Sequence, residues 1–387
     1  MASWKECTLS ELGTIVGGAT PSTKDESNYE NGDIPWITPK DLSTFTGRYI
    51  FNGERNITRK GLSSCSAQML PKNTVLFSSR APIGYVAIAG CPVCTNQGFK
   101  SVVPNDKTDP LFLYYLLKYN KDAIENMGSG TTFKEVSGGT MRNIKVVVPA
   151  DRDVQIKIGR ILGALDDKIE ANTQINNNLQ QQVSALFANF YDHAKIEVGF
   201  TEIIQILGGG TPKTGESTYW NGNVPFFTPK DVGSPYTLAT EKTITEEGLA
   251  RCNSRLYPTN TVFVTARGTV GKVGLSGVPM AMNQSCYALV GKCTHPLLVY
   301  FYTLKTVERL KHKASGAVFD AITTRDFESE TIMKLSDEDA KDFLNVAEPI
   351  YQAVLSNSIE NLQLASLRDS LLPKLMSGEI DVSGISL

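Results

Sequence analysis

The chain repeats itself, and this repeat limits its possible folds more than any other feature of the sequence. The segment that begins at Gly17 reads Gly-Gly-x-Thr-Pro and then Thr-Pro-Lys-Asp. The segment that begins at Gly208 contains both motifs again, 191 and 190 residues later. Further matches keep the same order at an offset of 187, for example Asn96 with Asn283. A period of this length is too long for a solenoid repeat, so the sequence predicts two copies of one domain.

Each copy has the pattern of a β-rich α+β domain. Short apolar and β-branched runs, such as those at 73–79 and 85–90, are bounded by Gly, Pro and Asn, as strands usually are. Apolar residues at helical spacing follow at about 110–125, and again at about 297–313. We therefore expect mixed domains in which several short strands precede a helix.

A different pattern follows each copy. Residues 153–191 contain no Pro and only two Gly, and their apolar residues recur mostly three or four positions apart. This spacing predicts a helix of about 40 residues, roughly 60 Å long, with an apolar stripe on which another helix can pack. Asn172 and Asn176 interrupt the stripe, where polar residues can fix the register of paired helices. The predicted stripe consists of Ile158, Ile161, Leu165, Ile169, Ile175, Leu179, Val183, Leu186 and Phe190.

A second long helix is expected after Ser336, where three acidic residues suit a helix N-terminus. Pro349 is expected either to kink this helix or to mark its true start. Its predicted apolar stripe consists of Val346, Ile350, Val354, Leu362, Leu367, Leu371 and Leu375. Two such helices most simply pack together as an antiparallel coiled coil, although each could instead pack on its own domain. The sequence thus predicts an α+β fold in which two long antiparallel helices form a spacer between two duplicated domains.

These patterns place the two domains at 1–150 and 193–335 and the helical regions at 151–192 and 336–387. The domains hold 16 and 15 Lys and Arg against 13 and 12 Asp and Glu, a net charge of +3 each. The helical regions carry −2 and −6. Charges of this size can arise by scatter, but basic domains suit nucleic acid and acidic helices suit a protein partner.

An antiparallel helix pair would relate the two domains by an approximate two-fold axis. The two strands of a DNA duplex are related by the same symmetry. Two reading domains arranged in this way would contact two separated half-sites about one helical turn apart, ~34–36 Å.

The ordered set of motifs resembles the specificity (S) subunit of type I restriction–modification systems, over essentially the whole chain. Residues 34–42 (IPWITPKDL), residues 96–98 (NQG) and the second Thr-Pro-Lys-Asp motif are typical of its target recognition domains. Residues 367–380 (LRDSLLPKLMSGEI) are typical of its second helical region. The resemblance implies that each recognition domain binds one half of a bipartite double-stranded DNA target. It also implies that the helices set the gap and dock two methyltransferase (M) subunits.

The resemblance further implies that this chain is a non-catalytic recognition subunit in the cytoplasm and binds no cofactor itself. S-adenosylmethionine, ATP and Mg are expected in partner subunits, which methylate adenine or form the restriction motor–nuclease (R) subunits. No apolar run nears the ~18–20 residues of a membrane span, and seven cysteines without paired spacing suit a reducing compartment. Two alternatives stay open: a bivalent protein-interaction scaffold, and a standalone DNA-modifying enzyme.

Arg and Lys side chains are expected to contact DNA, because they bind both phosphates and base edges. Residues shared by the copies, such as Arg80 with Arg267, are expected to bind phosphate or maintain the fold. Unshared residues, such as Arg55, Arg59 and Lys134, are expected to carry sequence choice. The predicted DNA-binding residues are Lys24, Lys40, Arg55, Arg59, Lys60, Arg80 and Lys134 in the first domain and Lys213, Lys230, Arg251, Arg267 and Lys272 in the second.

Other polar and aromatic motifs have weaker claims to a reading role. Asn96-Gln97 and its repeat Asn283-Gln284 could read adenine, but their position after a β-rich run favours structural hydrogen bonds. Trp36, Phe226 and Phe227 lie at strand-like positions and are expected in the core.

No catalytic or metal site is predicted. The glycine-rich segment at Gly208 has Pro212 where a phosphate-binding loop has glycine. The Asp/Asn-Pro-Pro-Tyr/Phe motif of adenine methyltransferases is missing, and Cys91 and Cys94 have no second cysteine pair for zinc. Asp166-Asp167 on the first long helix is expected to be a solvated face.

Overall fold

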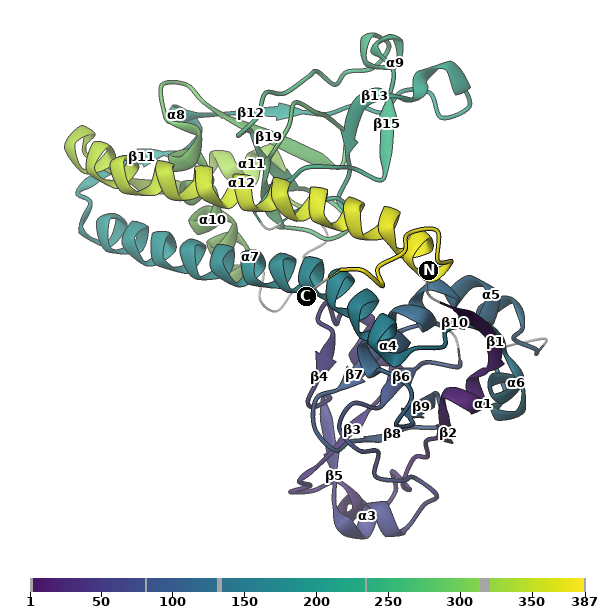
Figure 1. Cartoon of the computed structure of the whole chain (residues 1–387). Coiled ribbons are helices and arrows are strands. Elements are labelled where there is room, and N and C mark those ends of the chain that lie inside the picture. Colours follow the sequence, from purple (N-terminus) through teal and green to yellow (C-terminus); the bar gives the residue numbers. More distant parts are fainter. Residues whose placement is uncertain (1–2, 81, 131–133, 234, 314–320, 386–387) are drawn as a thin grey trace. The chain divides into compact units, whose positions relative to one another are not determined.

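The computed structural model describes residues 3–80, 82–130, 134–233, 235–313 and 321–385 of the chain. Two compact units make up the structure, and long helices α7 (Arg152–His193) and α12 (Asp337–Met376) run through both of them (Figure 1). The first unit comprises Met1–Glu170 and Gln363–Leu387, and the second comprises Ala171–Leu362. In the described part of the chain, no helix is long and apolar enough to cross a membrane.

The first unit contains a five-stranded sheet of order β2-β9-β6-β7-β4, a three-stranded sheet of order β5-β3-β8 and the pair β1-β10. Its strands are β1 (Trp4–Thr8), β2 (Gly13–Gly17), β3 (Ile34–Ile37), β4 (Tyr49–Ile50), β5 (Arg55–Ile57), β6 (Val75–Phe77), β7 (Val86–Ala89), β8 (Cys94–Thr95), β9 (Lys100–Pro104) and β10 (Lys145–Pro149). Its short helices are α1 (Leu9–Leu12), η1 (Glu26–Asn28), α2 (Pro39–Ser43), α3 (Arg59–Ser63), α4 (Pro110–Tyr119), α5 (Lys121–Asn126) and α6 (Gly138–Asn143).

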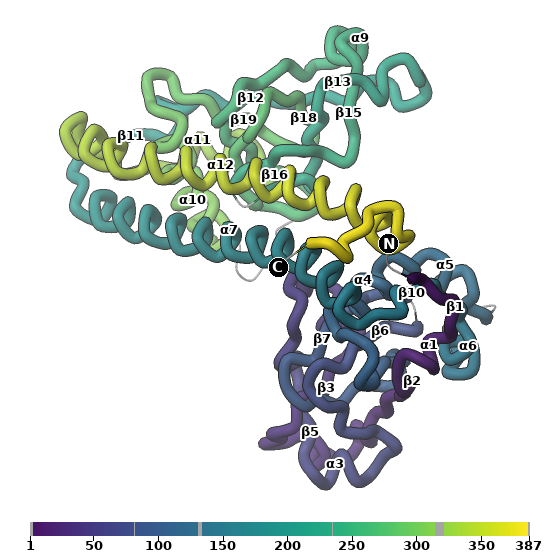
Figure 2. The backbone as a smooth tube through the Cα atoms, viewed as in Figure 1, coloured from purple at the N-terminus to yellow at the C-terminus, as the bar shows by residue number. Residues whose placement is uncertain are grey.

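The second unit repeats this topology strand for strand, with sheets β12-β19-β16-β17-β14, β15-β13-β18 and β11-β20. Figure 2 traces the path of the backbone through both units. Its strands are β11 (Ile196–Gly199), β12 (Ile204–Gly208), β13 (Trp220–Phe227), β14 (Tyr236–Thr237), β15 (Lys242–Ile244), β16 (Val262–Thr265), β17 (Val273–Ser276), β18 (Ala281–Met282), β19 (Cys286–Gly291) and β20 (Thr331–Lys334). Its short helices are α8 (Phe200–Ile203), η2 (Ser217–Tyr219), α9 (Glu246–Ala250), α10 (Pro296–Lys313) and α11 (Thr324–Glu328). The predicted duplication and the α+β fold class are confirmed.

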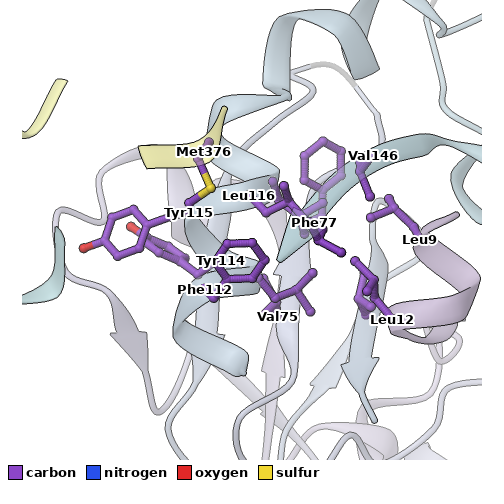
Figure 3. Packing of buried hydrophobic residues seen from close by; sticks show 14 of the residues in the cluster. Leu9, Leu12, Val75, Phe77, Phe112, Tyr114, Tyr115, Leu116, Val146 and Met376 are labelled. Carbon is purple, nitrogen blue, oxygen red and sulfur yellow. The ribbon is translucent and has the colours of Figure 1, made fainter. Parts of the chain in front are cut away.

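The core of the first unit forms where helix α4 covers the five-stranded sheet (Figure 3). Successive strand residues point to opposite faces, so Val75 and Phe77 of β6 meet α4 residues such as Phe112, while Leu76 joins a second cluster behind the sheet. All four side chains have no exposed surface. Each such side chain contributes about 1.5–3 kcal/mol when it leaves water, and the sheet is stabilised from both faces.

Aromatic rings dominate the corresponding core of the second unit. Phe187 of α7 stacks on Phe301 of α10 at 4.9 Å between ring centroids and meets Phe343 of α12 edge-on at 5.4 Å. Tyr351 of α12 also lies edge-on to Phe301, at 5.7 Å. Trp36, Phe226 and Phe227 are likewise buried, each in its own domain, so the expectation that they are core residues is confirmed.

The two long helices run antiparallel where they meet in the second unit. The Asn172 side-chain amide donates to Asn361 at 2.9 Å, and Asn176, one turn further on α7, accepts from Asn357 at 2.9 Å. Asn172 and Asn176 are 1% and 6% exposed, so polar side chains do interrupt a buried stripe as expected. Since each has hydrogen-bonding partners at one register, slippage of the helices would leave buried amides unpaired.

Two expectations for the helices are wrong. Ile175, Val346, Leu362 and Leu367, which the spacing assigns to the buried stripes, are exposed. The reason is that the domains also cover the helices, so the buried face of α12 follows Phe343, Ala347, Tyr351 and Val354. Helix α12 begins at Asp337, as the acidic residues after Ser336 predict, with the Ser336 hydroxyl accepting from the Asp339 amide at 3.1 Å, so Pro349 does not mark its start.

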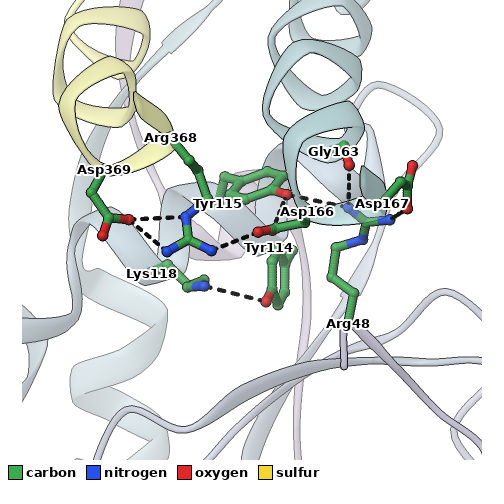
Figure 4. Close-up of polar contacts among 9 residues, drawn as sticks. All are labelled: Arg48, Tyr114, Tyr115, Lys118, Gly163, Asp166, Asp167, Arg368 and Asp369. Atoms are coloured by element: carbon green, nitrogen blue, oxygen red, sulfur yellow. Dashed lines mark hydrogen bonds and ion pairs between the residues drawn. The ribbon is translucent and has the colours of Figure 1, made fainter. Parts of the chain in front are cut away.

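The second error concerns Asp166, which is not part of a solvated face, whereas the Asp167 side chain is 64% exposed as expected. Asp166 is 16% exposed and accepts from Arg368 at 2.6 Å and from the Tyr115 hydroxyl, while Asp167 pairs with the buried Arg48 (Figure 4). Burial disfavours the charge of Arg48, but its bonds to Tyr115 and Asp167 outweigh this and raise its pKa. These contacts join α7, α12 and the first domain, which spacing alone cannot reveal.

Replacing Arg368 by Met should destabilise the first unit by about 2 kcal/mol, because the Asp166 carboxyl would be left in a mostly buried site without its cationic partner. The free energy of opening can be measured from hydrogen exchange of the α4 backbone amides. Lys374→Met on the same helix is the matched control, because its partner Glu379 lies 3.8 Å away and both side chains are more than half exposed. Equal losses in the two variants would contradict the assigned role of Arg368.

Candidate nucleic-acid interface

The Thr-Pro-Lys-Asp motif ties the end of β3 to the start of β5 in the first domain. Asp41 accepts from the Thr38 amide at 2.7 Å and the Thr38 hydroxyl at 2.6 Å, and its other oxygen accepts from the Glu54 amide at 2.7 Å. The Lys40 ammonium donates to Glu54 at 2.6 Å, a bond that raises the pKa of Lys40. A single carboxylate thus fixes the backbone on both sides of a chain reversal.

The second domain makes the same connection with its own copy of the motif. Asp231 accepts from the Thr228 amide at 2.8 Å and from the Glu241 amide at 2.8 Å, and Lys230 lies 3.7 Å from the Glu241 carboxylate. The shared Lys40 and Lys230 therefore have internal carboxylate partners in both domains. This agrees with the expectation that shared basic residues serve the fold or phosphate contacts.

The Gly-Gly-x-Thr-Pro motif lies directly against the loop that contains Asn96-Gln97. A Cβ atom on Gly18 would stand 2.1 Å from the Asn96 carbonyl oxygen, so no larger residue fits there. The Thr20 hydroxyl donates to the Gln97 side chain, and the Asn96 side chain accepts from the Gly98 amide at 2.9 Å. These contacts favour the structural interpretation of the motif over adenine reading. The second domain repeats them with Gly209, Thr211, Asn283 and Gln284.

All twelve basic residues predicted to bind DNA are described and exposed: Lys24, Lys40, Arg55, Arg59, Lys60, Arg80, Lys134, Lys213, Lys230, Arg251, Arg267 and Lys272. They are spread over both domains, on loops, on strand β5 and at the ends of short helices, and none lies on α7 or α12. Their exposure meets the first requirement for contact with a duplex.

Two of these residues in the first domain are also paired within the chain. Lys60 lies 3.0 Å from Asp25, whose pKa is lowered chiefly by a hydrogen bond from Ser27 and also by Lys60. Arg80 lies 2.9 Å from Glu135. Burial raises the pKa of Glu135, but Arg80 and Lys100 outweigh it and lower the pKa. Exposed pairs of this kind are weak and can be exchanged for phosphate contacts.

One pair of equivalent helices has opposite charge in the two domains. Helix α3 begins with Arg59-Lys60, whereas α9 begins with Glu246-Glu247. Both helices are capped in the same way by threonine, with the Gly61 or Gly248 amide donating to the hydroxyl at 3.0 Å. The fold of this element is retained while its surface has diverged, so the two domains offer different partners to any ligand at this point.

Arg55 and Lys242 occupy equivalent positions at the start of β5 and β15. The Arg55 guanidinium carbon lies 4.4 Å from the centroid of the Tyr29 ring, and the Lys242 ammonium lies 5.8 Å from that of Trp220. Lys242 is not among the residues predicted from sequence. The signal was present, because the repeat offset of 187 aligns it with Arg55, but a search for identical residues passes over an Arg aligned with a Lys.

Comparison with known proteins identifies the fold and the class. The type I restriction modification DNA specificity domain matches residues 1–181 and again residues 197–336. The chain belongs to this family. It is a DNA sequence-specificity subunit of the type I restriction–modification class, a recognition chain and not an enzyme. The scaffold alternative receives no support from these matches.

Two relatives extend over nearly the whole specificity subunit. It is 29% identical to the type I restriction enzyme MjaIX specificity subunit of Methanocaldococcus jannaschii, with 98% of this chain and 94% of the relative covered. It is 24% identical to the HindI specificity subunit of Haemophilus influenzae, with 98% and 100% covered. A crystal structure of an S subunit from M. genitalium has the same fold, with a TM-score of 0.64 at 15% identity over 97% and 96% of the two chains.

The motifs that resembled catalytic or metal sites have structural explanations in this specificity subunit. The glycine-rich segment at Gly208 leads from β12 into a loop and the three-residue η2, not into the long helix of a phosphate-binding loop. Cys94 is buried, which raises its pKa to about 11, and the Cys91 thiol contacts the Phe51 carbonyl at 3.1 Å. Within the described ranges, no three His, Cys, Asp or Glu side chains are grouped to hold a metal ion.

Proposed function

We propose that each recognition domain of this subunit binds one half of a bipartite double-stranded DNA target. The observation that carries the proposal is the repetition of one strand topology with differing exposed basic residues. One shared scaffold gives both domains the same mode of docking, and the differing side chains give each its own target. The +3 charge of each domain supports the attraction to phosphates that any duplex binding requires.

The proposal predicts that this chain alone decides where adenines are methylated. Modified adenines should be mapped at base resolution in DNA from cells that make the chain with its methyltransferase, and from cells that lack only the chain. A split motif with a fixed gap should be present in the first map and absent from the second. Identical maps would remove the proposed role and favour the scaffold alternative.

We also propose that the long helices set the gap between the half-sites. Helix α7 has 42 residues, a length of roughly 60 Å at ~1.5 Å per residue. The register of its contact with α12 is held by Asn172 and Asn176, whose buried amides have partners on that helix. A spacer that is both long and fixed in register suits a target with a constant gap.

Removing residues 169–175 from α7 together with residues 358–364 from α12 should shorten the gap by about three base pairs. Seven residues are close to two turns, roughly 10 Å, and the matched removal keeps opposing segments together. The methylation map of the variant complex should show both half-sites unchanged. Insertion of seven residues at both points should lengthen the gap instead. An unchanged gap in an active complex would contradict the spacer proposal.

We propose that methyltransferase subunits, two in the complete assembly, dock on exposed apolar side chains of the long helices. Ile359 and Leu362 of α12 are 38% and 51% exposed, and their spacing of three residues places them on one face. Ile175 of α7 is 47% exposed. Large apolar side chains exposed along a helix are typical of surfaces that a partner covers. The acidic charge of the helical regions supports a protein partner over DNA there.

Leu362→Asp combined with Ile359→Asp should weaken assembly with the methyltransferase subunit at least tenfold, because binding would bury two unpaired charges. Val147→Asp on β10 is the matched control, since Val147 is 49% exposed but lies in the recognition domain. Co-purification and sedimentation measure the effect. Equal assembly of both variants would place the docking surface elsewhere.

The remaining expectations concern where the chemistry takes place. We propose that S-adenosylmethionine, ATP and Mg bind only to the M and R subunits, in a cytoplasmic complex, and that this chain binds none of them. Calorimetry with S-adenosylmethionine separates the cases: the assembled complex should bind it and the isolated chain should not. Binding by the isolated chain would revive the enzyme alternative.

A further inference from the structure

A cation lies over one ring of an edge-to-face aromatic pair at the three-stranded sheet of the first domain. Arg55 begins strand β5, and its guanidinium lies 4.4 Å from the centroid of the Tyr29 ring. Tyr29 meets Trp36 of β3 edge-on at 6.0 Å. Trp36 is buried, Tyr29 is partly buried and Arg55 is exposed, so the three side chains run in order from the small core to the surface.

The second domain contains the same arrangement in different residues. Lys242 begins β15 with its ammonium 5.8 Å from the centroid of Trp220, and Trp220 meets Phe226 edge-on at 5.6 Å. Sheet register makes two of the positions equivalent, because Trp36 pairs with Arg55 as Phe226 pairs with Lys242. The third position is equivalent because Tyr29 and Trp220 are the C-cap residues of η1 and η2. Each of the three positions has changed identity, yet each has kept its chemical class.

Both aromatic supports are fixed by hydrogen bonds to the backbone. The Tyr29 hydroxyl donates to the Pro21 carbonyl at 2.6 Å, and the Trp36 indole donates to the Ala19 carbonyl at 3.1 Å. In the second domain the Trp220 indole donates to the Lys213 carbonyl at 3.2 Å. The rings therefore bind the cation in a restricted direction, which reduces the rotamer freedom that it would lose on contact with a ligand.

The strand that carries each cation is fixed at the preceding residue. The Glu54 amide donates to Asp41 and the Glu241 amide donates to Asp231, each from the repeated Thr-Pro-Lys-Asp motif. Among the described residues, neither Arg55 nor Lys242 has a carboxylate within ion-pair distance, unlike Lys40 and its repeat. Their charges are thus held in position and left available for an external partner.

We propose that Arg55 and Lys242 are specificity-determining residues, each of which reads a guanine in its own half-site. This inference rests on the proposed binding of one half-site by each domain. Guanine is the expected base because its O6 and N7 atoms in the major groove accept hydrogen bonds from Arg or Lys, the commonest specific contact. A phosphate contact would need no such restriction of direction and gives no sequence information.

The test uses the complete methyltransferase complex and maps methylated adenines at base resolution. Arg55→Ala should relax one guanine position in one half-site, with a roughly ten- to hundredfold loss of discrimination, and leave the other half-site unchanged. Lys242→Ala should do the converse. The unchanged half-site shows in each variant that the chain is folded and assembled.

Tyr29 is a positioning residue in this account. Tyr29→Phe keeps the ring and should keep the guanine preference, whereas Tyr29→Ala should relax the same base position as Arg55→Ala. Lys145→Ala is the matched control, because Lys145 is exposed on β10 of the same domain, outside the three-stranded sheet and outside the predicted DNA-binding set. It should leave the motif intact.

Each other outcome counts against the inference. An unchanged motif in Arg55→Ala, or a loss that is equal for all bases, makes the contact one to phosphate and overturns it. If Arg55→Ala abolishes methylation, the affinity of the assembled complex is measured instead, on duplexes that differ only at the guanine pair. An unchanged preference for guanine, or an equal loss of affinity for all bases, again overturns the inference. Failure of the proposed function is distinguishable, since the unaltered complex would then give no split motif that depends on this chain.

Discussion

Closure of the first domain by the last turns of the chain is the constraint on which the structure depends. Leu375, Met376 and Val382 are at most 2% exposed and belong to the same core as Phe112 of α4. Gly378 adopts a φ of +77°, and a Cβ atom there would stand 2.6 Å from the Trp4 indole nitrogen. Only glycine allows this close return of the chain. The first domain is therefore complete only when both ends of the sequence have come together, whereas Ala171–Leu362 is continuous.

The same topology meets the long helices through different chemistry in the two units. In the first, Arg48, Asp166 and Arg368 form directional ion pairs and hydrogen bonds around Tyr115. In the second, stacked and edge-on rings around Phe187 take their place. Charged groups with limited solvent are stable only beside their own partners, and rings pack best with rings. Each domain therefore packs best on its own segments of the long helices. This disfavours packing of one domain on the helix segments that belong to the other.

Much of this architecture could be predicted from periodicity and repetition. The duplicated domains, the antiparallel helices and the burial of Trp36 and Phe227 follow from local pattern, because strand and helix faces repeat with fixed periods. The exposure of Ile175 and the burial of Asp166 could not be predicted. Both depend on which domain surface covers a helix, which spacing does not contain. Lys242 was missed for another reason: identity between copies finds shared scaffold residues, and an aligned Arg and Lys are not identical.

The division between scaffold and reader has a physical basis. A side chain that already has an internal partner, as Lys40 has in Glu54 and Lys230 in Glu241, stabilises the turn that it belongs to and is kept in both copies. A side chain that reads a base edge is free to differ between two domains with different targets, because it has no internal partner to keep. Both domains need to hold that side chain in a fixed direction, and an edge-to-face pair of aromatic rings does this in each of them. In a duplicated recognition chain, the informative positions are therefore those where geometry and chemical class persist while the residue itself changes.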